Sequence, residues 1–152
     1  MDIDPNRQAI LFDIDGTLAD IEHRRSHLNK AEPDWAAFND EMGEDTPNKP
    51  VVDLYKTLWE HSQYELILVT GRNENARALT EQWLAWNEIP FGQMLMRPDK
   101  DYRADHLIKE EILGSLLSQG KVIVFTVDDR QQVVDMWRRN GITCLQCDVG
   151  DF

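Results

Sequence analysis

The stretch ILFDIDGTLAD, residues 10–20, combines an apolar run with two closely spaced acids and a glycine. The run ends at Phe12 and is typical of a short buried strand that is followed at once by a turn. Side chains alternate along an extended chain, so Asp13 and Asp15 stand on the same side and their charges repel each other. A strand-to-turn junction alone does not need such a pair. The pattern therefore predicts that a positive group lies between the two carboxylates.

Similar apolar runs recur along the chain and alternate with helical patterns. Strands are predicted at residues 8–14, 65–70 and 121–127, with weaker candidates at 92–96 and 142–147. Apolar residues recur at helical spacing within residues 51–59, 76–86, 108–116 and 133–137. Strand followed by helix, repeated, implies parallel strands joined by right-handed crossovers. The predicted fold is α/β, a three-layer sandwich around a parallel sheet of about five strands.

Polar residues follow three of these predicted strands. They are Asp13 with Asp15, Thr70 with Gly71 and Arg72, and Asp128 with Asp129. In such sheets the functional residues lie beyond the carboxyl ends of the strands, so we expect these side chains to meet in one crevice. Carboxylate oxygens bind hard cations, and magnesium accepts a few of them together with water and substrate phosphate. Mg²⁺ is therefore the expected cofactor.

Residues 19–50 interrupt the alternation of strands and helices. This segment is polar and turn-rich apart from a short amphipathic helix with Trp35, Phe38 and Met42 on one face. We interpret it as a small cap-like insert after the first strand that roofs the crevice. A surface excursion without a role is the alternative.

Length and composition indicate one globular domain over residues 1–152, with 41% hydrophobic residues. No apolar run approaches the roughly 20 residues of a membrane span, and the first residues do not resemble a secretory signal. We therefore expect a soluble, cytoplasmic protein that does not bind membranes. The net charge of −12 disfavours non-specific binding to long nucleic acid but leaves room for a local basic pocket.

Cys144 and Cys147 form a lone CxxC pair near the end of the chain. A structural zinc site needs a second pair of cysteines or two histidines at ligand spacing, and none follows. We expect two reduced thiols on or beside a late strand.

The residues at the crevice are suited to phosphoryl transfer. A carboxylate in this position can attack phosphorus and form an aspartyl-phosphate. The transfer further needs alignment and charge stabilisation, for which a hydroxyl and a cationic side chain suffice beside magnesium. Thr70 offers the hydroxyl. Lys109, on a helix predicted to start near Tyr102, is a candidate for the cation. Its helical position beside Glu110 and Glu111 by itself favours a solvated lysine.

DIDGTLAD, LVTGR, Lys109 and VDD, in this order, resemble the four signature motifs of the haloacid dehalogenase (HAD) superfamily of phosphohydrolases. The resemblance implies a HAD-like Rossmannoid fold. It also implies that Asp13 is the nucleophile and that Asp15 is the general acid-base. Thr70 and Lys109 would hold the transferring phosphoryl group.

The same resemblance implies a magnesium site. Its ligands would be Asp13, the backbone carbonyl of Asp15 and Asp128. Asp129 would be a further ligand or would orient the others. Gly16 would let the chain turn sharply away from the acids.

A closer resemblance extends over nearly the whole chain. YRADHLIKEEIL (102–113), VDDRQQVVDMWRRNGITCLQC (127–147) and the terminal GDF are similar to the 3′-phosphatase domain of phage-type polynucleotide kinase-phosphatases. In that family an arginine follows the acid-base aspartate by nine residues, another follows the motif-two glycine, and an aspartate precedes the motif-three lysine by four. Arg24, Arg72 and Asp105 occupy these positions and are implied to bind the substrate.

The kinase half of that family requires a GxxxxGK[ST] loop. Gly120 and Lys121 are followed by Val122 and lead into a strand, which does not fit that loop. We therefore expect no 5′-kinase activity.

The predicted function is a magnesium-dependent phosphomonoesterase that acts through an aspartyl-phosphate, with the 3′-phosphate of a polynucleotide end as its preferred substrate. Arg24 and Arg72 would clamp the phosphate or the neighbouring nucleotide. Arg97, Lys100 and Arg103 form either a basic approach to the site or a solvated loop. No protein partner is inferred.

Three alternatives differ from this function. A phosphatase for free nucleoside monophosphates would use the same chemistry on a small molecule. A phosphoaccepting signalling module would also use clustered acids, a threonine and a lysine, but it has no use for a general acid-base at Asp15. A catalytically inactive scaffold is disfavoured because every chemical position is filled.

Overall fold

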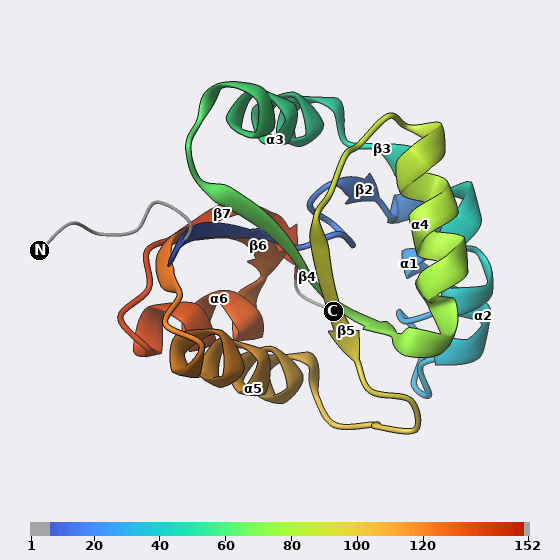
Figure 1. Ribbon diagram of the computed structural model, residues 1–152. Helices are drawn as coiled ribbons and strands as arrows, with labels where there is room; N and C mark the ends of the chain where they lie inside the picture. The colour runs from blue at the N-terminus through green and yellow to red at the C-terminus, as the bar shows by residue number, and fades with distance from the viewer. Residues whose placement is uncertain (1–6, 151–152) are drawn as a thin grey trace, which may run out of the picture.

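A five-stranded parallel sheet forms the centre of the protein in the computed structural model, which describes residues 7–150 (Figure 1). Its strands are β1 (Gln8–Phe12), β4 (Glu65–Asn73), β5 (Gln93–Arg97), β6 (Val122–Arg130) and β7 (Cys144–Gly150). Their order is β5-β4-β1-β6-β7, and every neighbouring pair is parallel. The predicted α/β fold is confirmed. The outer ends of the predicted domain, including the Asp-Phe of the terminal GDF, lie outside the described residues.

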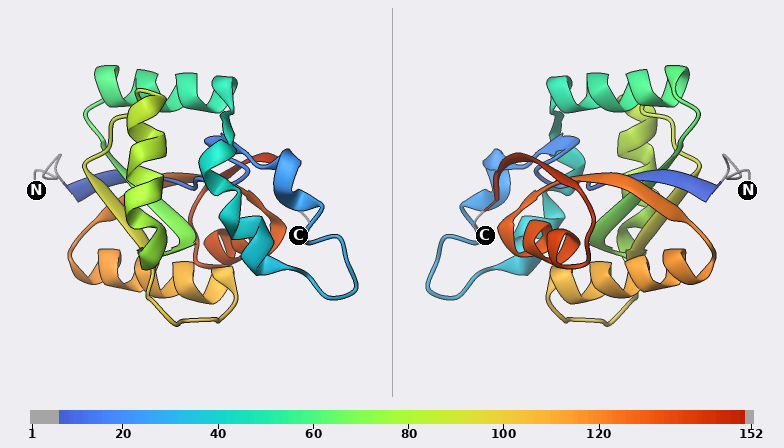
Figure 2. Two further views of the ribbon diagram at one scale, coloured as in Figure 1. Left: turned by 90° about the vertical axis from the view of Figure 1, so that its right-hand side faces the viewer. Right: turned by 90° about the vertical axis from the view of Figure 1, so that its left-hand side faces the viewer.

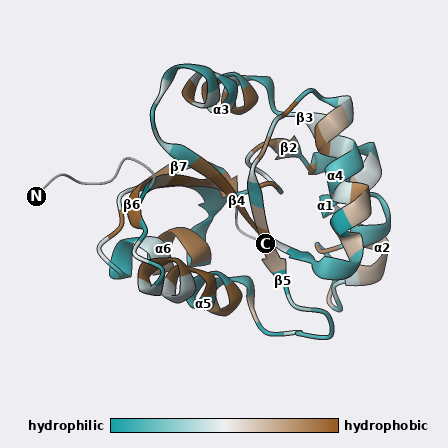
Figure 3. Ribbon diagram, viewed as in Figure 1, coloured by the Kyte–Doolittle hydropathy of each residue, from teal (hydrophilic) through white to brown (hydrophobic). Residues whose placement is uncertain are grey.

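Four helices cover the two faces of the sheet (Figure 1). They are α3 (Lys49–His61), α4 (Arg77–Trp86), α5 (Asp105–Ser118) and α6 (Gln131–Arg139). Ile10 and Phe12 belong to a buried cluster that includes apolar residues of α3 and α4, and Ala9 and Leu11 belong to a second cluster with residues of α5 and α6. Figure 3 shows hydrophobic residues concentrated on the strands between these helices. The alternation of side chains along β1 thus creates the three layers.

The central position of β1 brings the three polar segments together. Phe12 lies opposite Leu68 of β4 and Val127 of β6, and the backbone N–H of Asp13 donates to the carbonyl of Val127 at 3.1 Å. The polar residues that come next along the chain in all three places therefore start at one level of the sheet edge. This is the arrangement in which open α/β sheets place their ligands.

The segment after β1 folds as a compact insert whose two ends are joined. It contains β2 (Ala19–Asp20), α1 (Glu22–Arg25), α2 (Trp35–Asp40), the 3₁₀ helix η2 (Met42–Glu44) and β3 (Thr46–Pro47). β2 and β3 pair as antiparallel strands and close its base. Figures 1 and 2 show α1 and α2 on the side toward which the sheet strands point. Phe38 and Met42 are buried as expected from their shared face, whereas Trp35 is 45% exposed.

Several boundaries differ from the predicted ones. β1 ends at Phe12 rather than Ile14, because the chain turns at Gly16 immediately after the acids. β4 and β6 continue to Asn73 and Arg130, with irregular pairing near their ends. Backbone pairing of polar residues at a sheet edge leaves no hydrophobic pattern, so the sequence did not indicate these extensions.

The start of α5 also differs, since the helix begins at Asp105 and not near Tyr102. The loop before it turns through Lys100, which has a positive φ of 61°. The 3₁₀ helix η3 (Glu74–Ala76) precedes α4 and was not predicted separately.

Two expectations from composition concern the thiols and membranes. Cys144 and Cys147 lie on β7 as free cysteines, as expected for an isolated CxxC pair. Among residues 7–150, no helix combines the length and the apolar character that a membrane crossing requires.

Candidate active site

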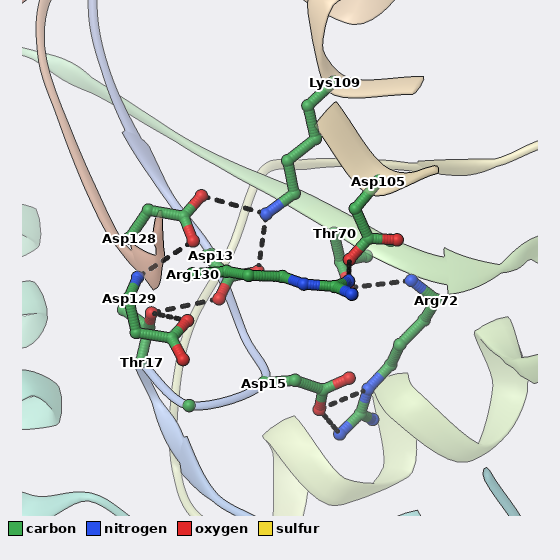
Figure 4. Close-up of polar contacts among 12 residues, drawn as sticks. Asp13, Asp15, Thr17, Thr70, Arg72, Asp105, Lys109, Asp128, Asp129 and Arg130 are labelled. Atoms are coloured by element: carbon green, nitrogen blue, oxygen red, sulfur yellow. Dashed lines mark hydrogen bonds and ion pairs between the residues drawn. The ribbon is translucent and has the colours of Figure 1, made fainter. Parts of the chain in front are cut away.

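Three carboxylates converge at the carboxyl edge of the sheet (Figure 4). Asp13 follows β1, Asp128 and Asp129 lie near the end of β6, and each offers an oxygen within 4.8 Å of the others. All three residues are buried. Burial and the charge of Asp128 raise the pKa of Asp129 to about 7 and also raise that of Asp13. A hard divalent cation such as Mg²⁺ fits this donor set, because its charge would offset the repulsion among the carboxylates.

The turn after Asp13 is shaped to admit Asp129. Gly16 has a φ of +80°, and a Cβ on it would lie 2.1 Å from an Oδ atom of Asp129. Thr17 then donates its hydroxyl to Asp13 Oδ2 at 3.0 Å, with Asp129 Oδ1 at 3.4 Å. Thr17 was not predicted as a site residue, although its place in the DIDGT stretch was a signal.

Lys109 reaches the acids from α5. Its ammonium group donates to Asp13 Oδ1 at 2.8 Å and to Asp128 Oδ2 at 2.9 Å, and the residue is only 2% exposed. Burial opposes the charged form, but Asp128 and Asp13 outweigh it and raise the pKa of Lys109 well above its usual value. The solvated lysine that its helical position favours is therefore not what the structure contains.

Thr70 lies at the edge of this group and is fully buried. Its hydroxyl oxygen accepts a hydrogen bond from the backbone N–H of Arg72 at 3.1 Å. The structure thus brings Thr70 to the same edge as Asp13 and Lys109, where it was predicted to hold the phosphoryl group (Figure 4).

The side chain of Asp15 turns away from the other acids toward Arg72 (Figure 4), and it also binds Arg24. Its Oδ1 accepts from Arg24 Nη2 at 2.7 Å, and from Arg72 Nε at 3.0 Å and Nη2 at 2.6 Å. Burial would raise the pKa of Asp15, but Arg72 and Arg24 outweigh it and lower the pKa to about 2. The carboxyl group of Asp15 lies outside the cluster of three acids. The predicted contact of Asp15 with a metal ion would therefore involve its backbone carbonyl, and this contact stays a prediction.

Arg24 is buried, whereas a residue that clamps the substrate is expected to be accessible to it. The residue is 0% exposed, and its guanidinium binds Asp45, Asp15 and the carbonyl of Phe38. It also lies 4.2 Å from the centre of the Phe38 ring. The observed role of Arg24 is to hold Asp15 against the insert, and its contact with the substrate stays a prediction.

Asp45 of the insert completes this network and was not predicted. Its side chain is fully buried; Oδ1 accepts from Arg24 Nε at 2.8 Å, and Oδ2 accepts from Arg24 Nη2 at 2.8 Å and Arg72 Nη2 at 3.1 Å. Its Oδ1 also lies 2.6 Å from His23 Nε2. Nothing in the turn-rich GEDTPNKP stretch distinguishes this acid from its neighbours, so sequence patterns could not have found it.

Replacing Asp45 with asparagine is expected to destabilise the folded chain by about 3 kcal/mol, because two buried guanidinium groups lose a charged partner. Urea unfolding would measure the change. Asp40→Asn removes the same charge from an exposed site in the same insert and is expected to stay within about 0.5 kcal/mol of wild type. Equal stability of the two variants would contradict the bridging role of Asp45.

Asp105 begins α5 and binds two further arginines. Its Oδ2 accepts from Arg130 Nη1 at 2.8 Å, and its Oδ1 pairs with Arg97. A Cβ on Gly71 would lie 2.5 Å from Asp105 Oδ1, so this glycine is needed for the close approach. Asp105 was predicted from family resemblance to bind substrate; the structure shows it positioning Arg97 and Arg130, the second of which was not predicted.

A cavity of about 550 Å³ opens over these groups. Asp13, Asp15 and Lys109 lie in its wall, and Trp35 and Phe38 of the insert contribute another side. Residues of the insert thus line the cavity together with the acids, and a capping role of the insert stays a prediction. Four arginines line the cavity, namely Arg72, Arg97, Arg103 and Arg130, whereas Lys100 is not among its lining residues in the described chain.

Without a divalent ion, the free energy of unfolding is expected to fall as the pH rises from about 4 to about 7. The folded chain holds the Asp129 proton up to a pKa of about 7, whereas the usual pKa of an aspartate side chain is 3.8. Between these values the folded state binds more protons than the unfolded state, so the slope of stability against pH is negative. The pKa of Asp15 is lowered to about 2, so its contribution to the free energy of unfolding rises with pH, and it does so only at lower pH.

Urea unfolding at several pH values in EDTA would measure this slope. Millimolar Mg²⁺ is expected to restore stability mainly at the higher pH, since it binds the ionised carboxylates. Asp129→Asn is the control and is expected to reduce the slope, and the part that remains is expected from Asp13, whose pKa burial also raises. A wild-type stability that is independent of pH in EDTA would contradict the expected titration.

Comparisons with known proteins agree with this geometry. Residues 7–152 match the family model described as the polynucleotide kinase PNKP phosphatase domain. A chain of the Pnkp1/Rnl/Hen1 RNA repair complex is similar at 36% identity with a TM-score of 0.80, over 100% of this chain and 46% of that one. A chain in another structure of the Pnkp1/Rnl/Hen1 complex gives the same identity and TM-score, over 97% and 48%. The present chain thus spans about half the length of those chains.

More distant structures share the fold. A haloacid dehalogenase-like hydrolase from Streptococcus pneumoniae is similar at 17% identity with a TM-score of 0.60, over 93% of this chain and 84% of that one. At this identity the similarity concerns the α/β architecture alone.

Proposed function

The chain belongs to the family of polynucleotide kinase PNKP phosphatase domains, and on this basis we propose that it is a magnesium-dependent phosphomonoesterase that removes the 3′-phosphate from a polynucleotide end. Membership in this family makes the chain a phosphatase domain of the HAD type. The surroundings of Asp13 support the proposed 3′-phosphatase activity, because this buried carboxylate is bound by Lys109 and Thr17 in the wall of a cavity lined by arginines.

Asp13 is the nucleophile in this proposal. One of its carboxylate oxygens attacks the phosphorus, the bond between phosphorus and the 3′-oxygen breaks, and an aspartyl-phosphate forms. Lys109 stabilises the negative charge at this point, and Thr70 aligns the phosphoryl group. Asp13, Asp128 and Asp129 would hold Mg²⁺, which supplies further positive charge toward the phosphoryl oxygens when bound.

Asp15 moves the protons. It gives one to the leaving 3′-oxygen, then takes one from the water that attacks the aspartyl-phosphate, and so returns to its starting form. The products are the 3′-hydroxyl end and inorganic phosphate, and Asp13 is regenerated.

The two arginines hold Asp15 ionised, so it needs a change of partners before it can donate a proton. Arg72 binds Asp15 and also lines the cavity. A phosphate that accepts hydrogen bonds from Arg72 would weaken this hold and raise the pKa of Asp15. Arg24, which is not among the lining residues of the described chain, would keep the carboxyl in place through Asp45.

A substrate panel tests the proposal. Release of inorganic phosphate would be measured for an oligonucleotide with a 3′-phosphate, for the same oligonucleotide with a 5′-phosphate, and for free nucleoside monophosphates. We expect the highest kcat/KM for the 3′-phosphate end and loss of turnover in EDTA that added Mg²⁺ restores. Equal or better turnover of free nucleotides would overturn the polynucleotide preference and leave a small-molecule phosphatase.

A further inference from the structure

The cavity is larger than a phosphate group requires. Its volume of about 550 Å³ lies in the range of about 300–1,000 Å³ that is typical of sites enclosing whole small-molecule ligands. Asp13 and Lys109 occupy one part of its wall, and aromatic side chains lie elsewhere in the same wall. The site therefore has room for the unit that carries the phosphate, not only for the phosphate itself.

Trp35 is the most distinctive of these aromatic residues. It is the first residue of α2, lines the cavity and remains 45% exposed. The preceding Asp34 accepts a hydrogen bond from the backbone N–H of Ala37 at 3.1 Å, which caps the helix at this point. A large ring that is exposed inside a cavity, on a capped helix, is available for contact with a ligand.

Contacts with Phe38 and Arg130 also hold the Trp35 ring in place. It packs against Phe38 in an edge-to-face arrangement, with 5.6 Å between ring centres and an angle of 85° between ring planes. Phe38 is buried and in turn contacts the guanidinium of Arg24. The guanidinium carbon of Arg130 lies over one face of the Trp35 ring, 5.9 Å from its centre, which leaves the opposite face for a ligand. The ring is thus connected to the network that positions Asp15, and its orientation is restricted before any ligand binds.

From this geometry we infer that Trp35 is a stacking surface for the nucleobase of the terminal nucleotide whose 3′-phosphate Asp13 attacks. Every nucleobase offers a π face, so stacking recognises a polynucleotide end without selecting its sequence. The inference rests on the proposed function and deepens it, because it assigns the part of the substrate that lies beside the reacting phosphate. Tyr102, which is 89% exposed and lines the same cavity, is a separate aromatic residue and serves as a comparison.

Substitutions of Trp35 test the inference by their effect on KM. Trp35→Leu keeps an apolar side chain against Phe38 but removes the π face, and we expect it to raise KM for a 3′-phosphorylated oligonucleotide about 5- to 150-fold. Trp35→Phe keeps a ring and is expected to stay within about threefold of wild type. Neither variant should change kcat by a comparable factor, since Trp35 does not touch the reacting atoms.

Two substrates without a terminal base separate stacking from a general structural effect. One is the same oligonucleotide with an abasic unit carrying the 3′-phosphate, and the other is glycerol 2-phosphate. Trp35→Leu is expected to leave kcat/KM for both within about twofold of wild type. Tyr102→Leu, on the loop before α5, shows how much an exposed ring in this cavity contributes without a support such as Phe38.

These measurements distinguish a failure of base stacking by Trp35 from a failure of the proposed 3′-phosphatase function. An equal loss on all three substrates, or identical KM values for Trp35→Leu and Trp35→Phe, would overturn stacking while leaving the 3′-phosphatase function intact. Base stacking would likewise be overturned if the wild-type enzyme hydrolysed abasic and ordinary 3′-phosphate ends with the same KM. A wild-type enzyme that turns over glycerol 2-phosphate but not 3′-phosphorylated ends would overturn the proposed function and the stacking inference together.

Discussion

Asp13→Asn is expected to lower kcat for a 3′-phosphorylated oligonucleotide by at least about 10⁴-fold, because an amide cannot attack phosphorus as a carboxylate does. The substitution keeps the size of the side chain. It also relieves repulsion with Asp128 and Asp129, so we expect the folded chain to remain stable. Steady-state release of inorganic phosphate would measure the loss, and intact-protein mass spectrometry would show no phosphorylated species.

Asp135→Asn on α6 is the matched control, since it removes the same charge at an exposed position away from the cavity. Its kcat/KM is expected to equal that of wild type. Turnover by Asp13→Asn within tenfold of wild type would rule out Asp13 as the attacking group.

Asp15→Asn is expected to lower turnover of the 3′-phosphorylated oligonucleotide by about 10²- to 10⁴-fold, through loss of proton transfer to the leaving oxygen. The effect should depend on the leaving group. With p-nitrophenyl phosphate, whose leaving group departs without a proton, formation of the aspartyl-phosphate should be slowed much less. Its hydrolysis should still be slow, because the asparagine cannot take a proton from water. A covalent species heavier by one phosphoryl group should therefore accumulate.

Asp20→Asn, an exposed position at the base of the same insert, is the control for the Asp15 variant. Equal losses on the two leaving groups, with no trapped species, would argue against Asp15 as the acid-base. They would instead indicate that the variant disturbs the network of Arg24 and Arg72.

The fold and the acid cluster were predictable because their signals are local. A buried strand is apolar over a few consecutive residues, and the turn that ends it is polar, so β1, β4 and β6 could be read from the chain one at a time. Parallel pairing then forces the ends of these strands to one edge. Asp13, Asp128 and Asp129 meet for this reason, and the cation site that they would form stays a prediction.

Lys109 shows where local signals fail. A lysine on a helix beside two glutamates favours a solvated position, and only the resemblance to a known family placed it in the site. The packing of α5 against the sheet decides the matter, since it leaves Lys109 2% exposed between two carboxylates. No periodicity in the sequence reports which end of a helix meets the edge of a sheet.

The sequence by itself determined the three-layer α/β architecture and the acids at its edge, because hydrophobic periodicity and strand-to-turn junctions are properties of a few neighbouring residues. Only the tertiary structure decided the partners of Asp15, the burial of Arg24 and Asp45, and the exposure of Trp35 within the cavity. Arg24 and Asp45 are 21 residues apart, and Asp15 and Arg72 are 57 apart. Contacts at such separations depend on how the insert folds back over the sheet, and the charge of each residue alone does not specify its partner.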